Sequence, residues 1–153
     1  MEFLDKDQFV IAITNDNIVD YCEILSLLRE FDEEFYPRHS SLVIHEHYAK
    51  KLAENSRCIR VFCDGLLSAC AFYYENTAAN DIYITFLCAK LIFRRKGLSS
   101  KIIDYLTNKY SNKYKSISLS VRIDNTPAIK FYQAKDFVFI AQNDKQYIMR
   151  KYI

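Results

Sequence analysis

The stretch RRKGLSSK, residues 94–101, places one of the two glycines of a 153-residue chain after three cations and before two serines. The residues that follow carry apolar side chains at helical spacing, which predicts a helix beginning near Gly97. The first turn of a helix leaves up to four backbone N–H groups without intrahelical partners and carries a partial positive charge. Gly97 has no Cβ to hold an anion away, and Ser99 and Ser100 add hydroxyl donors. The stretch therefore predicts a binding site for a phosphate or pyrophosphate.

The composition bounds the class of protein. A chain of 153 residues that is 50% hydrophobic and 26% charged predicts one globular domain, residues 1–153. The net charge of +2 argues against a nucleic-acid partner, so the cations before Gly97 are a local feature. The segment MEFLDKDQF lacks the pattern of a signal peptide, and LLSACAFYY is too short to span a bilayer. We expect a cytoplasmic protein without a membrane partner, either a monomer or a homodimer.

Five cysteines form no C-x-x-C pair, and four of them lie in apolar runs. This pattern is typical of buried free thiols in a reducing compartment.

Hydrophobic periodicity predicts the elements in order. Strands are expected at 9–14, 58–63, 66–74, 81–89, 116–121, 137–142 and 146–153, and helices at about 17–35, 42–55, 97–110 and 126–134. Asp16 or Asn17 can cap the first helix. The pair Asp64-Gly65 predicts a tight hairpin. The expected fold is α/β (α+β), a mixed and mainly antiparallel sheet of about seven strands flanked by four helices, in the order β-α-α-β-β-β-α-β-α-β-β.

Two motifs in this order resemble the GNAT superfamily of acyl-CoA-dependent N-acetyltransferases. The segment LCAKLIFRRKGLSS matches the family's strand followed by [RQ]-x-x-G-x-[GA] at a helix start, with Arg94, Gly97 and Ser99 at the marked positions. The segment VRIDNTPAIKFYQAKDF is similar to the family's strand and N-x-x-A-x-x-x-Y helix. Its matching residues are Asn125, Ala128, Tyr132 and Phe137. Ser99 and Asp136 stand where the family usually has a smaller residue and a glycine.

The resemblance implies that acetyl-CoA is the cosubstrate and that no metal is needed. It implies that the strands 81–89 and 116–121 part near Ala89 and Val121, where the thioester arm would lie. The residues expected to bind the cofactor are Cys88, Ala89, Arg94, Arg95, Lys96, Gly97, Leu98, Ser99, Ser100, Asn125, Ala128 and Tyr132.

Tyr132 is the candidate acid for the departing thiolate. A phenol has a reference pKa of ~10 and a thiol one of ~8.5, so proton transfer within a hydrogen bond is feasible. The alternative is that Tyr132, one of twelve tyrosines, packs its helix against the sheet. Asn125 can likewise serve as a simple helix cap.

The acceptor is expected to be a primary amine on a polyamine, an amino sugar or a peptide, because the segment FDEEFYPRHSS is acidic and aromatic. Asp32, Glu34, Tyr83 and Thr85 are the candidate acceptor-binding residues, and His39 lies in the same segment as Asp32. No residue identifies itself as the base that must deprotonate the amine. For each of these side chains, an ordinary surface or packing position is the favoured alternative.

Other groups of residues give weaker indications of function. His45 and His47 are two residues apart and lie on different sides of a helix, which does not favour a metal site. Cys88 has no neighbour in sequence that would activate a thiol as an acyl carrier. A non-catalytic acyl-CoA-binding or interaction module on the same fold remains the alternative to an enzyme.

Overall fold

The computed structural model describes residues 1–5, 9–35 and 37–153, and of Arg95 the backbone alone. Within these residues, eight strands form one sheet in the order β1-β2-β3-β4-β5-β6-β8-β7, and four α-helices accompany them. The chain divides into two compact units, residues 1–72 with 86–99 and residues 73–85 with 100–153. Strands β4 (Leu66–Asn76) and β5 (Asp81–Ala89) contribute to both. The predicted class, a mixed and mainly antiparallel sheet with four helices, is confirmed.

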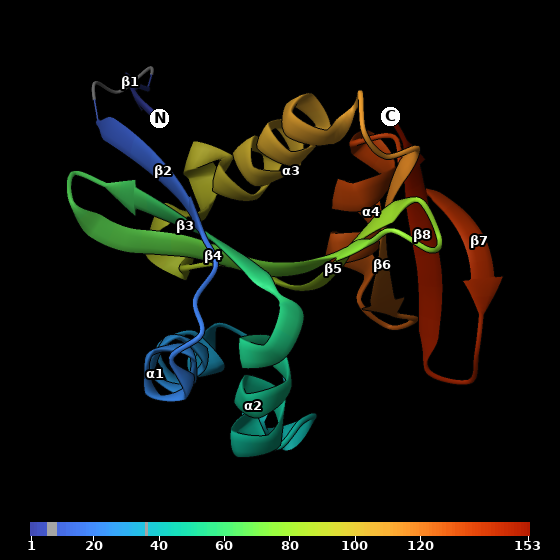
Figure 1. Cartoon of the computed structure of the whole chain (residues 1–153), viewed down its shortest axis with the longest axis horizontal. Helices are drawn as coiled ribbons and strands as arrows, with labels where there is room; N and C mark the ends of the chain where they lie inside the picture. Colours follow the sequence, from blue (N-terminus) through green and yellow to red (C-terminus); the bar gives the residue numbers. More distant parts are fainter. Residues whose placement is uncertain (6–8, 36) are drawn as a thin grey trace. The chain divides into compact units, whose positions relative to one another are not determined.

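The first unit contains β1 (Glu2–Leu4), β2 (Val10–Asp16), β3 (Arg57–Cys63), α1 (Tyr21–Glu30) and α2 (His45–Asn55). The short strand β1 pairs antiparallel with β2 and has no counterpart in the sequence prediction. In Figure 1, α1 and α2 lie side by side on one face of β2, β3 and β4. The apolar face of α1 buries Ile24, Leu25, Leu27 and Leu28 there.

The start of α1 differs from the sequence prediction. Asp20 is the N-cap, and its Oδ1 accepts a hydrogen bond from the N–H of Glu23 at 3.0 Å. The predicted cap Asp16 belongs to β2, where its carboxylate lies 2.7 Å from Nη2 of Arg60. Strand β2 therefore runs to the residue expected to cap the helix, and α1 begins at Tyr21, four residues later than predicted.

The first unit also contains the short 3-10 turns η1 (Asp32–Glu34), η2 (His39–Ser41) and η3 (Leu91–Lys96). Because η2 forms separately, α2 begins at His45 and not near residue 42. The hairpin between β3 and β4 follows the prediction, since Asp64 has φ 48° and Gly65 has φ 79°. Two successive positive φ values are what a type I′ turn requires.

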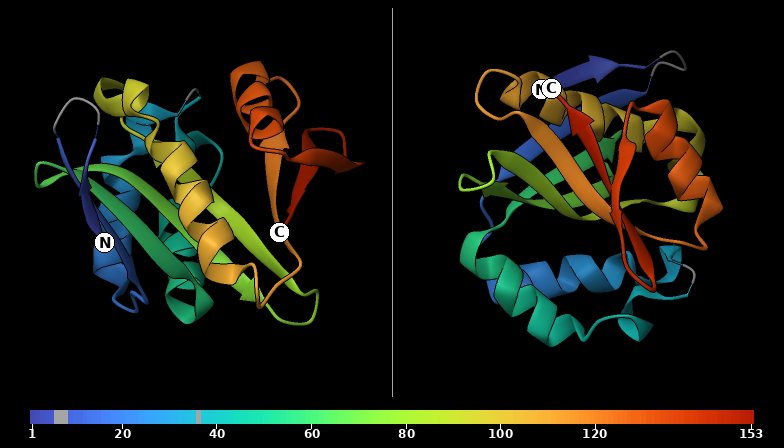
Figure 2. Two further views of the ribbon diagram at one scale, coloured as in Figure 1. Left: turned by 90° about the horizontal axis from the view of Figure 1, so that it is seen from above. Right: turned by 90° about the vertical axis from the view of Figure 1, so that its right-hand side faces the viewer.

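The second unit contains α3 (Leu98–Tyr110) from Ser100 onward, β6 (Ser116–Arg122), α4 (Thr126–Ala134), β7 (Val138–Gln142) and β8 (Gln146–Tyr152). Strand β8 pairs antiparallel with both β6 and β7, and Figure 2 shows α4 next to this hairpin. Helix α3 buries Ile102, Ile103, Leu106 and Tyr110. The hydroxyl of Tyr110 lies 2.8 Å from that of Tyr73 in the core of the unit.

Strands β5 and β6 are parallel, and their ladder joins Asp81–Ile84 to Ser116–Leu119. The buried carboxylate of Asp81 accepts hydrogen bonds from the hydroxyls of Ser116 and Ser118 at the start of this ladder. A buried carboxylate is tolerated only where such donors satisfy it. The ladder ends at Ile84 and Leu119, although β5 runs on to Ala89 and β6 to Arg122. Its end comes earlier than the predicted parting point.

The helix α4 ends in a left-handed residue. Asp136 has φ 69°, and the N–H of Phe137 donates to the carbonyl of Tyr132 at 3.0 Å. This is the backbone conformation that glycine adopts most easily after a helix. Asp136 therefore adopts, at an energetic cost, a conformation that a glycine would adopt freely at the position where the resemblance leads us to expect one.

Replacing Asp136 by glycine should raise the free energy of unfolding by about 0.5–1 kcal/mol, because the left-handed conformation then carries no side-chain penalty. The lost ion pair with Lys151 contributes little, since the Asp136 side chain is 88% exposed and the charges are 3.9 Å apart. Denaturant unfolding measures the change. Asp136→Asn is the control and should be nearly neutral, and a glycine variant less stable than the native protein would contradict the assignment.

Candidate active site

The connection between β5 and α3 contains the predicted anion site, and it is more ordered than the sequence indicated. The N–H of Lys90 donates to the carbonyl of Ser68 at 2.8 Å, and η3 follows at once. Gly97 then adopts φ 64° and ψ 34°, and α3 begins at Leu98. The 3-10 turn η3 was missed because LIFRRK has no periodicity that distinguishes it from a loop.

Gly97 is favoured by its backbone conformation. A Cβ added at this residue would meet no atom of the described residues within 4 Å, apart from its two chain neighbours, so crowding within the protein does not demand glycine. The positive φ favours glycine, since a residue with a Cβ adopts it only at an energetic cost, as Asp136 does. The left-handed turn directs the chain into α3 and leaves Ser99 and Ser100 half-buried in its first turn, after the buried Leu98.

The described cations of this connection contact the protein itself. Arg94 donates through Nε to the carbonyl of Ala89 at 3.3 Å and through Nη2 to the carbonyl of Glu34 at 2.8 Å. Nζ of Lys96 lies 3.3 Å from Oδ2 of Asp5 and 3.6 Å from the ring centroid of Phe9. The side chain of Arg95 lies outside the described part of the structure. Arg94 and Lys96 are thus both engaged with other groups of the first unit.

The acidic segment predicted to face a cationic acceptor is also engaged within the first unit. Oε2 of Glu34 accepts from the N–H of Leu91 at 2.8 Å, and Glu30 lies 2.6 Å from Nζ of Lys90. Asp32 accepts from both the N–H and the hydroxyl of Ser40, at 2.6 and 2.9 Å. These carboxylates therefore carry partners before any acceptor arrives.

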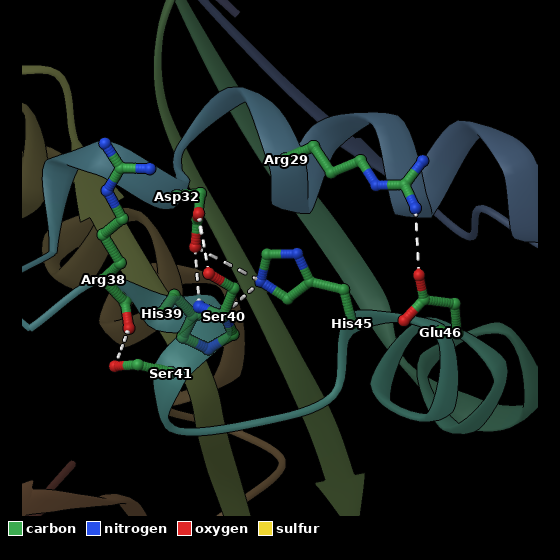
Figure 3. A network of polar contacts seen from close by, with 8 residues as sticks. All are labelled: Arg29, Asp32, Arg38, His39, Ser40, Ser41, His45 and Glu46. Carbon is green, nitrogen blue, oxygen red and sulfur yellow. Dashed lines mark hydrogen bonds and ion pairs between the residues drawn. The ribbon is translucent and has the colours of Figure 1, made fainter.

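Asp32 belongs to a cluster that sequence reasoning did not assemble, shown in Figure 3. Nδ1 of His39 lies 2.9 Å from Nε2 of His45, which is 3.7 Å from Oδ1 of Asp32. Both imidazoles are buried, and Phe35, Tyr48 and Phe86 surround His39. One nitrogen of the close pair must donate and the other accept, so the pair is stable with a single shared proton. Sequence spacing pairs His45 with His47, whose side chain is exposed.

The cluster shifts the pKa of two of its members. Burial, together with the neighbouring His45 and against the attraction of Asp32, lowers the pKa of His39 to about 4. Burial alone would raise the pKa of Asp32, but hydrogen bonds from Ser40 and the charges of His45 and Arg38 lower it. His39 is therefore neutral at pH 7.

The protein should lose stability in acid through His39. The unfolded chain takes up a proton on this residue near pH 6.5, whereas the folded chain does so only near pH 4. This contribution is complete above pH 6.5 and is lost as the pH falls toward 4, amounting to on the order of 2–3 kcal/mol. Urea unfolding between pH 4 and 7 measures it.

His39→Asn keeps a polar atom near the position of Nδ1 but cannot titrate, so its stability should fall less steeply over this interval. His47→Gln is the matched control at an exposed histidine and should follow the native curve. Equal slopes for His39→Asn and the native protein would refute the contribution of His39.

In the second unit, α4 presents the residues of the second motif. Oδ1 of Asn125 accepts from the N–H of Ala128 at 3.3 Å and caps the helix. The half-buried ring of Tyr132 lies 5.2 Å from that of Phe131 and 5.5 Å from that of Phe137, between centroids. Asn125 thus has a structural role that sequence reasoning had offered as an alternative.

The remaining predicted residues lie on β5. The hydroxyl of Tyr83 is 3.0 Å from Oγ of Ser120 in the second unit, and Thr85 is half-buried. In the first unit, Cys88 is buried and its Sγ lies 3.9 Å from the carbonyl oxygen of Ala89. Burial raises the pKa of Cys88 to about 12 despite the neighbouring charge of Arg94. A thiol that stays protonated is not a nucleophile at neutral pH.

Within the described residues, no three or more His, Cys, Asp and Glu side chains are arranged to hold a metal ion. The helices described there are also too short or too polar to cross a membrane.

Comparison with known proteins places the chain in a family. Residues 8–137 match the model described as the acetyltransferase (GNAT) family. The chain belongs to this family. It is therefore an acetyltransferase, and the resemblance that the two sequence motifs carry is confirmed.

Solved structures of similar fold agree. One is the ribosomal-protein-S18-alanine N-acetyltransferase of Escherichia coli, with TM-score 0.74, 16% identity and 94% coverage of each chain. The PaiA N-acetyltransferase of Thermoplasma acidophilum in complex with coenzyme A has TM-score 0.68, 15% identity and coverage of 93% and 99%. Arabidopsis thaliana NAA60 with a bisubstrate analogue has TM-score 0.67, 15% identity and coverage of 93% and 98%. At these identities the similarity establishes the fold.

Proposed function

We propose that the protein transfers an acetyl group from acetyl-CoA to a primary amine by direct attack in a ternary complex. The observation that carries the proposal is the left-handed Gly97 immediately before α3, within a segment that the family model covers. This turn directly precedes α3 at the residue where the family motif has its glycine, and the first N–H groups of a helix lack intrahelical partners. A pyrophosphate there would accept hydrogen bonds from the amides of residues 96–99 and from the hydroxyls of Ser99 and Ser100.

The structure of the similar Thermoplasma enzyme contains coenzyme A, which supports acetyl-CoA as the cosubstrate. In our proposal the other expected cofactor contacts are Cys88, Ala89 and Leu98 in the first unit and Asn125, Ala128 and Tyr132 in the second. Arg94 and Lys96 contribute positive charge near the phosphates while holding their protein partners.

The transfer itself needs protons to move at two atoms, the amine nitrogen and the thiolate sulfur. The neutral amine attacks the thioester carbonyl, a carbon–nitrogen bond forms, the carbon–sulfur bond breaks, and the thiolate of coenzyme A leaves. The nitrogen, positively charged after the attack, releases a proton to water, and water restores the proton that the acid gives to the thiolate. We assign Tyr132 as the acid that protonates this thiolate. The amine first loses a proton to a base or to water, and no described residue identifies itself in this role. His39 is a poor candidate because its pKa of about 4 makes it a weak base.

The acceptor is proposed as a peptide amine, with a polyamine or an amino sugar as the other classes. Two observations support this order. The carboxylates of Asp32 and Glu34 already hold protein partners, so they offer less charge to a polycation than the sequence suggested. The Escherichia coli enzyme of similar fold is named for an alanine of a ribosomal protein.

Tyr132→Phe should lower kcat by about 100-fold, a usual contribution of one general acid, with little change in affinity for coenzyme A. Thiol release from acetyl-CoA across a panel of amines and amino-terminal peptides measures it. Tyr152→Phe is the control, since this side chain is 66% exposed. An unchanged kcat would leave Tyr132 a packing residue. Binding of coenzyme A by the native protein without turnover on any amine would indicate a non-catalytic module.

A further inference from the structure

The connection from β5 to α3, residues 90–97, is called the cofactor loop below. A carboxylate from the segment after α1 holds its beginning. Oε2 of Glu34 accepts the N–H of Leu91 at 2.8 Å, and the Glu34 side chain is only 22% exposed. A hydrogen bond from a backbone N–H to a half-buried carboxylate is stronger than one between neutral groups. This bond fixes the course of the chain as it leaves β5.

Arg94 ties the same two segments together a second time. Its Nη2 donates to the main-chain carbonyl of Glu34 at 2.8 Å and lies 3.7 Å from the Glu34 carboxylate. Its Nε reaches back to the carbonyl of Ala89, the last residue of β5. The guanidinium therefore spans from the end of the strand to the end of η1, all within the first unit.

We propose that Glu34 is a positioning residue for acyl-CoA binding. With Arg94 as its partner, it holds the cofactor loop in the conformation from which Gly97 turns into α3. This inference rests on the proposed function, in which the start of α3 receives the pyrophosphate. Glu34 need not touch the cofactor. Because Glu34 orders the loop in the free protein, cofactor binding does not have to supply the free energy of ordering it.

A direct role for Arg94 predicts the opposite effect of removing Glu34. If the guanidinium were chiefly a phosphate ligand, Glu34 would compete with the phosphate for it and repel the anion. Neutralising Glu34 would then tighten coenzyme A binding. If the carboxylate positions the loop, its removal leaves the N–H of Leu91 and the guanidinium without that anchor, and binding weakens.

The test is calorimetric titration of coenzyme A into the native protein and four variants. Glu34→Ala should raise the Kd about tenfold, the effect of losing one charge-assisted hydrogen bond. Glu33→Ala removes the same charge one residue away, from an exposed pair with Arg38, and should stay within about twofold. Arg94→Lys keeps the charge but not the three contacts, so it should weaken binding. Glu34→Ala combined with Arg94→Lys should be little worse than Glu34→Ala alone, because lysine keeps the positive charge and both changes break the same set of loop contacts.

Kinetics separates positioning from a general loss of structure. In Glu34→Ala the KM for acetyl-CoA should rise in parallel with the Kd, while kcat at saturation and the KM for the amine stay unchanged. A damaged fold would instead lower kcat.

Tighter or unchanged binding in folded Glu34→Ala would overturn the inference while leaving the proposed function intact. Failure of the native protein to bind coenzyme A would overturn both. Should Glu34→Ala not fold, Glu34→Gln replaces it. The amide oxygen can still accept from Leu91, so Kd should rise about threefold, and a lower Kd would overturn the inference.

Discussion

The left-handed turn at Gly97 is the constraint on which the active-site assignment depends. A strand that ends at Ala89 must become a helix at Leu98 within eight residues, and the chain does so through a 3-10 turn followed by one residue with positive φ. Glycine takes that conformation without the penalty that a Cβ imposes. The helix start, and any anion site on it, is thereby placed by the backbone.

The segment from the end of α1 to the start of α2 binds the residues that lead into this turn. Glu30 and Glu34 hold the beginning of the cofactor loop through Lys90 and Leu91, while Asp32 secures η2 through Ser40. The pair His39 and His45 then fixes the approach to α2 among aromatic rings. From the sequence, Asp32 and Glu34 suggested a surface for a cationic acceptor. In the structure, their carboxylates bind other groups of the first unit.

Local signals predicted much of this fold. The bounds of β5 and α4 agree with the sequence, since β-branched and aromatic runs, Pro127 in a first turn and Asp64-Gly65 act over a few residues. Contacts between residues that are far apart in the sequence could not be predicted. Nothing near Glu34 indicates a bond to Leu91, 57 residues away, and the partner of His45 is His39 and not the nearer His47. The sequence therefore predicted that a helix starts beside Gly97, but it did not predict which protein groups bind the side chains of Arg94 and Asp32.

The most direct measurement is an amide NMR titration of the protein with coenzyme A, in parallel with pantetheine, which lacks the phosphates. If the start of α3 receives the pyrophosphate, coenzyme A will cause the largest shifts at the backbone amides of Gly97, Leu98, Ser99 and Ser100, and pantetheine will cause small shifts there. Coenzyme A that binds while these four amides stay unchanged would show that the pyrophosphate lies elsewhere.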